Sequence, residues 1–213
     1  VEVCNVEGIR YLSITTVSEL TECDLHILSR LSFAYSIFKI DNCNEIRLIP
    51  VSKINYEYVD NKISHLLKYH GKTNELFTKM MINIALLTSS FDYQKKIRLL
   101  DPVAGKGTTL FEAAIYGFNG FGIEVEPKLV YEATVFFKKF LETERYKHCF
   151  NKRQISGINK SDAVYIQEFE YSVSKDDFKN KKNRKKTGFI NGNSLDVSKF
   201  FKTNYFHLIV GDL

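Results

Sequence analysis

The sequence predicts an α/β protein in which strands and helices alternate along most of the chain. Three observations support this prediction. The apolar run at residues 97–100 leads into a glycine-containing turn and then a helical pattern at 108–116. A second run at 120–124 precedes a helical apolar stripe from 127 to about 147, and a further apolar run lies at 206–210. Units of this kind are typical of a parallel sheet covered by helices.

The composition is that of a globular protein. Of 213 residues, 44% are hydrophobic and 26% charged, and the net charge of +5 leans towards a polyanionic partner. No apolar stretch reaches about 18 residues, so we expect no membrane span and a cytoplasmic protein. The cysteines are dispersed without a C-x-x-C pair, which favours reduced thiols and no metal site. They are Cys4, Cys23, Cys43 and Cys149.

Residues 1–55 have the pattern of a small α+β accessory domain, and residues 56–213 form the larger one. We expect two strands that turn at Glu7 and Gly8, a helix capped by Ser18 or Thr21, and further strands at about 33–40 and 46–51. Residues 56–90 are predicted to be mostly helical. An apolar repeat is expected to face a sheet there, formed by Leu76, Met80, Ile84 and Leu87.

The glycine-containing turn has the features of a ligand site. Asp101 ends the first strand, and Gly105 and Gly107 allow a backbone to approach a ligand beside a helix N-terminus. A P-loop is disfavoured because Leu100 stands where its first glycine belongs. A dinucleotide fingerprint is weakened because Leu110 replaces its third glycine. An ordinary strand–loop–helix connection without a ligand is the plain alternative.

The fourteen residues from Asp101 to Ala114 read Asp-Pro-Val-Ala-Gly-Lys-Gly-Thr-Thr-Leu-Phe-Glu-Ala-Ala. They closely resemble the first motif of class I S-adenosyl-L-methionine-dependent methyltransferases. The nearest branch methylates exocyclic amines of RNA bases, as the tRNA guanine-amine methyltransferases and their bacterial relatives do. The resemblance spans roughly residues 69–213. It implies a Rossmann-like, doubly wound sheet of which this chain provides about four strands, incomplete at the C-terminus and truncated at the catalytic motif.

The resemblance implies S-adenosyl-L-methionine as cofactor. Asp101 and the glycines would meet its methionine end, Glu124 both ribose hydroxyls, and Asn193 the adenine amine in place of the family's acid. Glu126 is a less favoured ribose acid and fits a helix start better. The implied contacts are Thr73, Asn74, Asp101, Pro102, Ala104, Gly105, Gly107, Thr108, Glu124, Val125, Asn193 and Ser194. For Thr73 and Asn74, a helix cap is the open alternative.

The run at 206–210 delivers Gly211-Asp212-Leu213 to the carboxyl edge of the sheet. In the resembled family the catalytic motif opens here with an acid. By resemblance, Asp212 accepts a hydrogen bond from the target amine and orients it towards the methyl group. A DNA or protein amine methyltransferase and a non-catalytic RNA-binding subunit are alternatives, and a nicotinamide oxidoreductase is a more distant one.

A basic cluster lies between residues 179 and 186. It is expected to be either a solvated loop or an edge that contacts the phosphates of tRNA or rRNA. Its members are Lys179, Lys181, Lys182, Arg184, Lys185 and Lys186.

Overall fold

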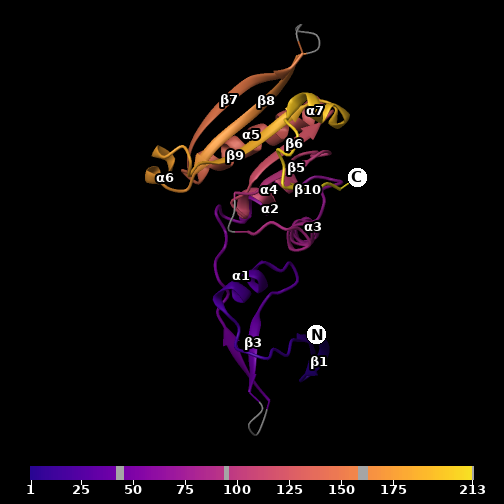
Figure 1. Ribbon diagram of the computed structural model, residues 1–213, viewed down its shortest axis with the longest axis vertical. Coiled ribbons are helices and arrows are strands. Elements are labelled where there is room, and N and C mark those ends of the chain that lie inside the picture. The colour runs from indigo at the N-terminus through magenta and orange to yellow at the C-terminus, as the bar shows by residue number, and fades with distance from the viewer. Residues whose placement is uncertain (42–45, 94–95, 158–162, 213) are drawn as a thin grey trace. The chain divides into compact units, whose positions relative to one another are not determined.

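The computed structural model describes residues 1–41, 46–93, 96–157 and 163–212 (Figure 1). The chain divides into two compact units, Val1–Tyr56 and Glu57–Leu213. Cys43 and Leu213, considered above, lie outside the described residues. The other three cysteines are free thiols. None of the described helices is long and apolar enough to cross a bilayer.

The described residues of the first unit form two antiparallel strand pairs and one helix. Its elements are β1 (Glu2–Val6), β2 (Ile9–Ser13), α1 (Glu22–Arg30), β3 (Ile37–Asp41) and β4 (Arg47–Val51). The first hairpin turns at Glu7 and Gly8, which both have positive φ. Thr21, not Ser18, caps α1, and its hydroxyl and backbone exchange hydrogen bonds with Asp24. The first hairpin, the helix and the strand expected at 46–51 are confirmed, whereas the strand expected at about 33–40 begins only at Ile37.

The second unit is a mixed α/β structure. Its elements are α2 (Lys62–Leu66), α3 (Glu75–Leu87), β5 (Arg98–Asp101), α4 (Thr108–Ile115), β6 (Asn119–Glu124), α5 (Pro127–Thr143), β7 (Lys147–Ser156), β8 (Val164–Ser172), α6 (Lys175–Lys179), β9 (Lys185–Asn191), the 3₁₀ helix η1 (Ser194–Asp196), α7 (Val197–Phe200) and β10 (Leu208–Ile209). The six-stranded sheet has the order β10-β5-β6-β9-β8-β7. The first four strands are parallel, and β8 and β7 are antiparallel.

The two faces of this sheet pack against different cores. On one face, Phe137 of α5 lies against the rings of Phe169, Tyr171 and Phe189, with centroids 5.3, 5.5 and 5.9 Å away. On the other face, a buried apolar cluster includes Phe121, and it packs against α7 and the aromatic segment that follows. Because successive strand residues point to opposite faces, both cores hold the same strands in place.

Two predictions for residues 143–173 are wrong. The helix predicted to reach about Lys147 ends at Thr143, because Arg145 adopts a left-handed conformation with φ 58° and turns the chain into β7. Residues 164–173 do not form a strand pair, since β8 is one strand and its partner is β7. The polar sequence of β7 lacks an apolar alternation, so its strand signal is weak. The sheet therefore has six strands instead of about four.

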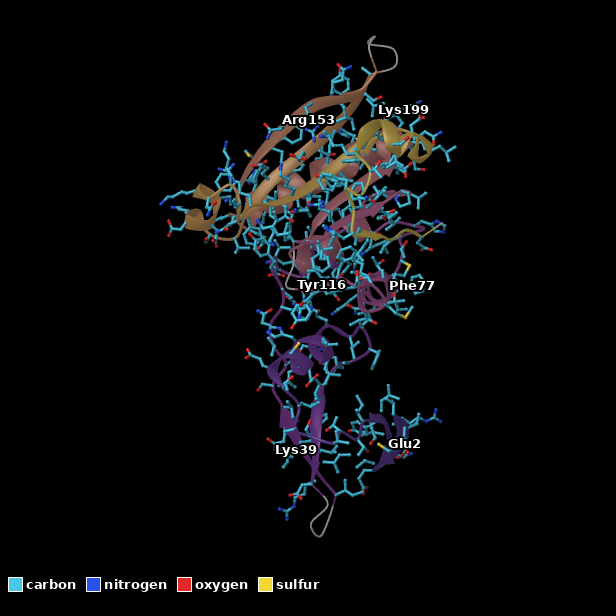
Figure 2. The ribbon with its side chains drawn as sticks, viewed as in Figure 1. Glu2, Lys39, Phe77, Tyr116, Arg153 and Lys199 are labelled. Carbon is cyan, nitrogen blue, oxygen red and sulfur yellow. The ribbon has the colours of Figure 1, made fainter. Side chains whose placement is uncertain are left out.

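The predicted apolar stripe of α3 is also wrong. Leu76, Met80, Ile84 and Leu87 are exposed, and Phe77 beside them is 44% exposed (Figure 2). The buried residues are Thr78, Ile82, Asn83 and Leu86. The two polar residues among them have hydrogen-bond partners. Tyr116 donates to Asn83 Oδ1 at 2.6 Å, and Thr78 donates to the carbonyl of Asn74 at 3.2 Å. Because α3 is apolar on nearly all sides, periodicity does not select its buried face.

Candidate functional site

The expected site residues gather where the direction of strand addition reverses. From β5 the chain adds β6 and then β9 on one side, whereas β10 returns to the other side of β5. Asp101 ends β5, and Asp212 follows β10 in the parallel neighbour. The carboxyl ends of parallel strands at such a switch point form the usual ligand crevice of open α/β sheets.

The loop between β5 and α4 is held by its own backbone amides. Val103 N–H donates to Asp101 Oδ1 at 2.9 Å, and Gly105 N–H donates to Glu124 Oε2 at 2.9 Å. Ala104 N–H donates to the carbonyl of Ile123 at 3.0 Å, so the loop is tied to β6 at two points. Gly105 and Gly107 have φ 52° and 90°, which are left-handed values that favour glycine. Pro102 lies at the start of the same loop.

Gly122 is a site residue that the sequence reasoning missed. A Cβ at this position would lie 2.6 Å from the Cβ of Ala104 and 2.8 Å from a methyl group of Leu110. A side chain on β6 would therefore push the loop away from the sheet. The signal was present, because a glycine inside a strand marks a close approach of another chain segment.

Glu124 uses both carboxylate oxygens to organise the end of β6. Oε2 accepts from Gly105, and Oε1 accepts from the amide of Glu126 at 2.8 Å. Glu126 itself caps α5, with its side chain accepting from Lys128 N–H at 3.4 Å. Each carboxylate oxygen of Glu124 has a second lone pair available for a ligand hydroxyl. Glu126 therefore caps a helix, whereas Glu124 is oriented towards the glycine loop.

Three carboxylates contribute to the electrostatics of the loop. Burial raises the pKa of Asp101 to about 6, and the charges of Glu124 and Asp212 add to the rise, against hydrogen bonds from Thr109 and Val103. Asp101 is only 2% exposed. Among the described residues, none forms an ion pair with any of these three acids. The site is therefore negative and disfavours an anionic ligand group.

Lys106, the cation within the loop sequence, does not offset this charge. Its ammonium lies 2.6 Å from a carboxylate oxygen of Glu132 and 4.7 Å from the ring centroid of Tyr69. The phenol of Tyr69 in turn lies 3.3 Å from the hydroxyl of Thr108, the buried first residue of α4. These contacts fasten the segment before α3 onto the glycine loop.

This segment also reaches Asp212. Thr73 Oγ1 donates to Asp212 Oδ2 at 3.0 Å. Asn74 instead caps α3, with its oxygen accepting from Leu76 and Phe77 at 2.9 and 3.2 Å. Thus Asn74 has the capping role that was left open, whereas Thr73 contacts the expected catalytic acid. Gly211 brings that acid close, because a Cβ there would lie 3.1 Å from Asp101 Oδ1.

β9 contributes a second site residue that the sequence reasoning missed. Asn191 Nδ2 donates to the carbonyls of Glu124 and Val125 at 3.0 and 2.9 Å and so ties β9 to β6. Asn193 caps η1, which begins at Ser194, and its oxygen accepts from Leu195 N–H at 3.0 Å. Val125 is 67% exposed beside these polar groups. The two strand ends therefore present an apolar surface next to amide groups.

The six basic residues near β9 do not form one surface. Lys179 ends α6, and Lys181 and Lys182 are exposed in the loop after it. Arg184 pairs with Glu170 at 3.0 Å. Lys186 pairs with Glu168 and Glu170 at 3.0 and 2.7 Å. Lys185 lies over the ring of Tyr58, and burial lowers its pKa. The cluster is divided between a loop and a strand, because β9 begins at Lys185, and contact of these residues with RNA stays a prediction.

Comparison with models of known protein families finds no match, and no curated protein matches the sequence either. Within the described part of the chain, no group of three or more His, Cys, Asp and Glu side chains could hold a metal ion.

Proposed function

We propose that the chain is an S-adenosyl-L-methionine-dependent methyltransferase with a Rossmann-like, doubly wound sheet, and that it methylates an exocyclic amine of a base in tRNA or rRNA. The observation that carries the proposal is the Glu124–Gly105 hydrogen bond beside Asp101. This bond supports the proposal because it holds an acid that could accept from a ribose diol beside a glycine loop, close to the buried carboxylate of Asp101.

The residues fit the chemical groups of this cofactor. A sulfonium and an ammonium are both cationic, and Asp101, Glu124 and Asp212 supply negative charge and form no ion pair with another described residue. Glu124 retains acceptor capacity for a ribose diol. Val125 offers apolar surface for the adenine, and the Asn193 oxygen has a second lone pair for its amine.

The same geometry argues against a dinucleotide. A diphosphate binds through free loop amides at a helix N-terminus. Here the amide of Gly105 is already bonded to a carboxylate, and Lys106 is paired with Glu132. A diphosphate in this crevice would meet three carboxylates and no free cation among the described loop residues.

The proposed chemistry requires mainly positioning. When bound, the cofactor supplies a methyl group activated by the positive sulfur. Asp212 would accept a hydrogen bond from the target amine and orient its lone pair. Thr73 donates to one oxygen of that carboxylate, so the acid is oriented before the substrate arrives. The choice of a base amine in RNA comes from the resemblance of residues 101–114 to the RNA branch.

Calorimetric titration tests the cofactor. We expect S-adenosyl-L-methionine to bind with a micromolar dissociation constant and NAD not to bind. Glu124→Ala should weaken binding by at least about tenfold, as loss of a charge-assisted pair of hydrogen bonds implies. Glu126→Ala, which removes a neighbouring acid that caps α5, is the matched control and should leave affinity within about twofold. Binding of NAD, or of neither ligand, would refute the proposal.

The substrate class is tested by transfer of a labelled methyl group. Small RNA, single-stranded DNA and a lysine-rich protein are offered in parallel. Label in the RNA, alkali-stable on the base, supports the proposal. Label only in DNA or protein would keep the methyltransferase and overturn the choice of RNA.

A further inference from the structure

The antiparallel ribbon of β7 and β8 extends the sheet on the side away from β10, and β7 is its outer strand (Figure 1). Arg153 is opposite Ile166, which is opposite Ile190 near the end of β9. That end of the ribbon is therefore level with the carboxyl edge that carries Glu124. Three strand spacings separate β6 from β7, which is about 14 Å. The ribbon and the candidate site share one edge of the sheet.

The outer strand is basic. β7 contains Lys147, Lys152 and Arg153 and no acidic residue. The acids of β8 have other cations, because Lys186 pairs with both Glu168 and Glu170. Arg153 reaches Glu168 only at 3.8 Å, and its side chain remains 56% exposed (Figure 2). The charge of β7 is thus largely available to a polyanion.

Exposed aromatic rings accompany these charges. Phe150 and Tyr165 are 43% and 37% exposed. Lys152 Nζ lies 5.0 Å from the centroid of the Tyr165 ring. Phe150 and Lys152 point to the same face because they are two residues apart, and Tyr165 is opposite Gln154 on that face. Arg153 is the next residue after Lys152 and points to the opposite face, so the outer edge of β7 has a cation on each side and rings on one side. Cations beside exposed rings bind unpaired nucleotides by phosphate contact and base stacking.

We propose that the outer side of the β7–β8 ribbon binds a single-stranded segment of the RNA substrate. The choice of RNA rests on the proposed function, but the binding does not require the cofactor. Two other uses of the same strand exist. First, lysines on an edge strand prevent aggregation by edge-to-edge pairing. Second, an open edge can bind a strand of a partner protein. Both predict no effect of these residues on RNA affinity.

The test is fluorescence anisotropy with a labelled 20-nucleotide oligouridylate and the whole chain. Lys152→Ala/Arg153→Ala should weaken binding about tenfold and reduce the salt slope by about 1.4, as two single-strand phosphate contacts predict. Lys138→Ala/Lys139→Ala removes the same charge from the exposed side of α5 and is the matched control. Lys186 still neutralises Glu168 in the first variant, so the sheet should remain intact.

A second pair of variants tests stacking. Tyr165→Ala should weaken binding about fivefold or more, whereas Tyr165→Phe should retain it, because a phenyl ring still stacks on a base. Equal weakening by the ribbon double and the α5 double would show a net-charge effect and overturn the proposal, as would no change in the ribbon double. If RNA binding behaves as expected but S-adenosyl-L-methionine does not bind, the ribbon assignment stands and the proposed methyltransferase fails.

Discussion

Thr73 donates a hydrogen bond to Asp212 at 3.0 Å, although 139 residues separate them in the chain. The donor precedes α3, and the acceptor follows β10. The contact holds one carboxylate oxygen of Asp212 and leaves the other for a ligand. Direct contact of Thr73 with a cofactor stays a prediction.

Thr73→Ala should disturb Asp212 without disturbing the rest of the cofactor site. Sinefungin has an amine where S-adenosylmethionine has its methyl group, and S-adenosylhomocysteine has neither. Because Asp212 would attract the amine, the ratio of the affinities for sinefungin and S-adenosylhomocysteine reports on Asp212. We expect the variant to lose about tenfold of that preference, since a hydrogen bond to a charged group contributes about 1.5 kcal/mol, and to bind S-adenosylhomocysteine as before. Thr73→Ser should restore the preference. Calorimetry measures both ligands, and an equal loss for both would place Thr73 on the cofactor.

Asp101→Asn should stabilise the protein at alkaline pH. The pKa of Asp101 rises from 3.8 to about 6 on folding. The folded state then binds more protons between about pH 4 and 6, and stability falls as pH rises through this range. At 1.36 kcal/mol per unit, the ionised acid costs about 3 kcal/mol above pH 6, and asparagine avoids that cost. Urea unfolding at pH 4 and 8 checks this, and no gain at pH 8 would contradict it.

The same substitution should weaken S-adenosyl-L-methionine binding, because a cationic ligand prefers the ionised acid. In the unmodified protein, binding should strengthen as pH rises from about 5 to 7 and should release a fraction of a proton near pH 6. Titration at pH 6 in two buffers of different ionisation enthalpy measures this release. An affinity independent of pH would remove Asp101 from the ligand site.

Glu112→Gln should change stability but not binding. Burial raises the pKa of Glu112 to about 7, and the side chain lies within α4, 5% exposed. Its ionisation therefore opposes folding as pH rises from about 4.5 to 7. We expect the glutamine variant to be more stable at pH 8 by about 1–3 kcal/mol and unchanged at pH 4.5. A loss of stability at pH 8 would show that Glu112 ionises with a compensating partner.

Gly122→Ala should displace the glycine loop. Its new Cβ would meet Ala104 at 2.6 Å, whereas Gly120→Ala on the same strand meets nothing closer than 3.3 Å. We expect a loss of about 2–3 kcal/mol for the first variant and less than about 1.5 kcal/mol for the second, as overpacking of differing severity implies. Thermal unfolding of the pair measures the difference, and equal losses would contradict the close approach of loop and strand.

Local patterns predicted the central part of the fold. The strand before Asp101, the turn at Gly105 and the helix after it are adjacent in sequence and follow short-range rules of periodicity and glycine conformation. The same rules located Glu124 at the end of the next strand. They failed for α3, where apolar residues on all sides leave the buried face undetermined, and for β7, whose polar residues give no alternation.

The amino-acid sequence alone determined the α/β class, the glycine turn and the acids that follow its strands, because each depends on residues near one another in the chain. Tertiary structure decided which of those groups meet. It brought Thr73 to Asp212 and tied Asn191 to Glu124. It also paired Arg184 and Lys186 with acids of β8 and placed β7 at the sheet edge. Such contacts depend on strand order and register, which bring distant segments together and which no local pattern encodes.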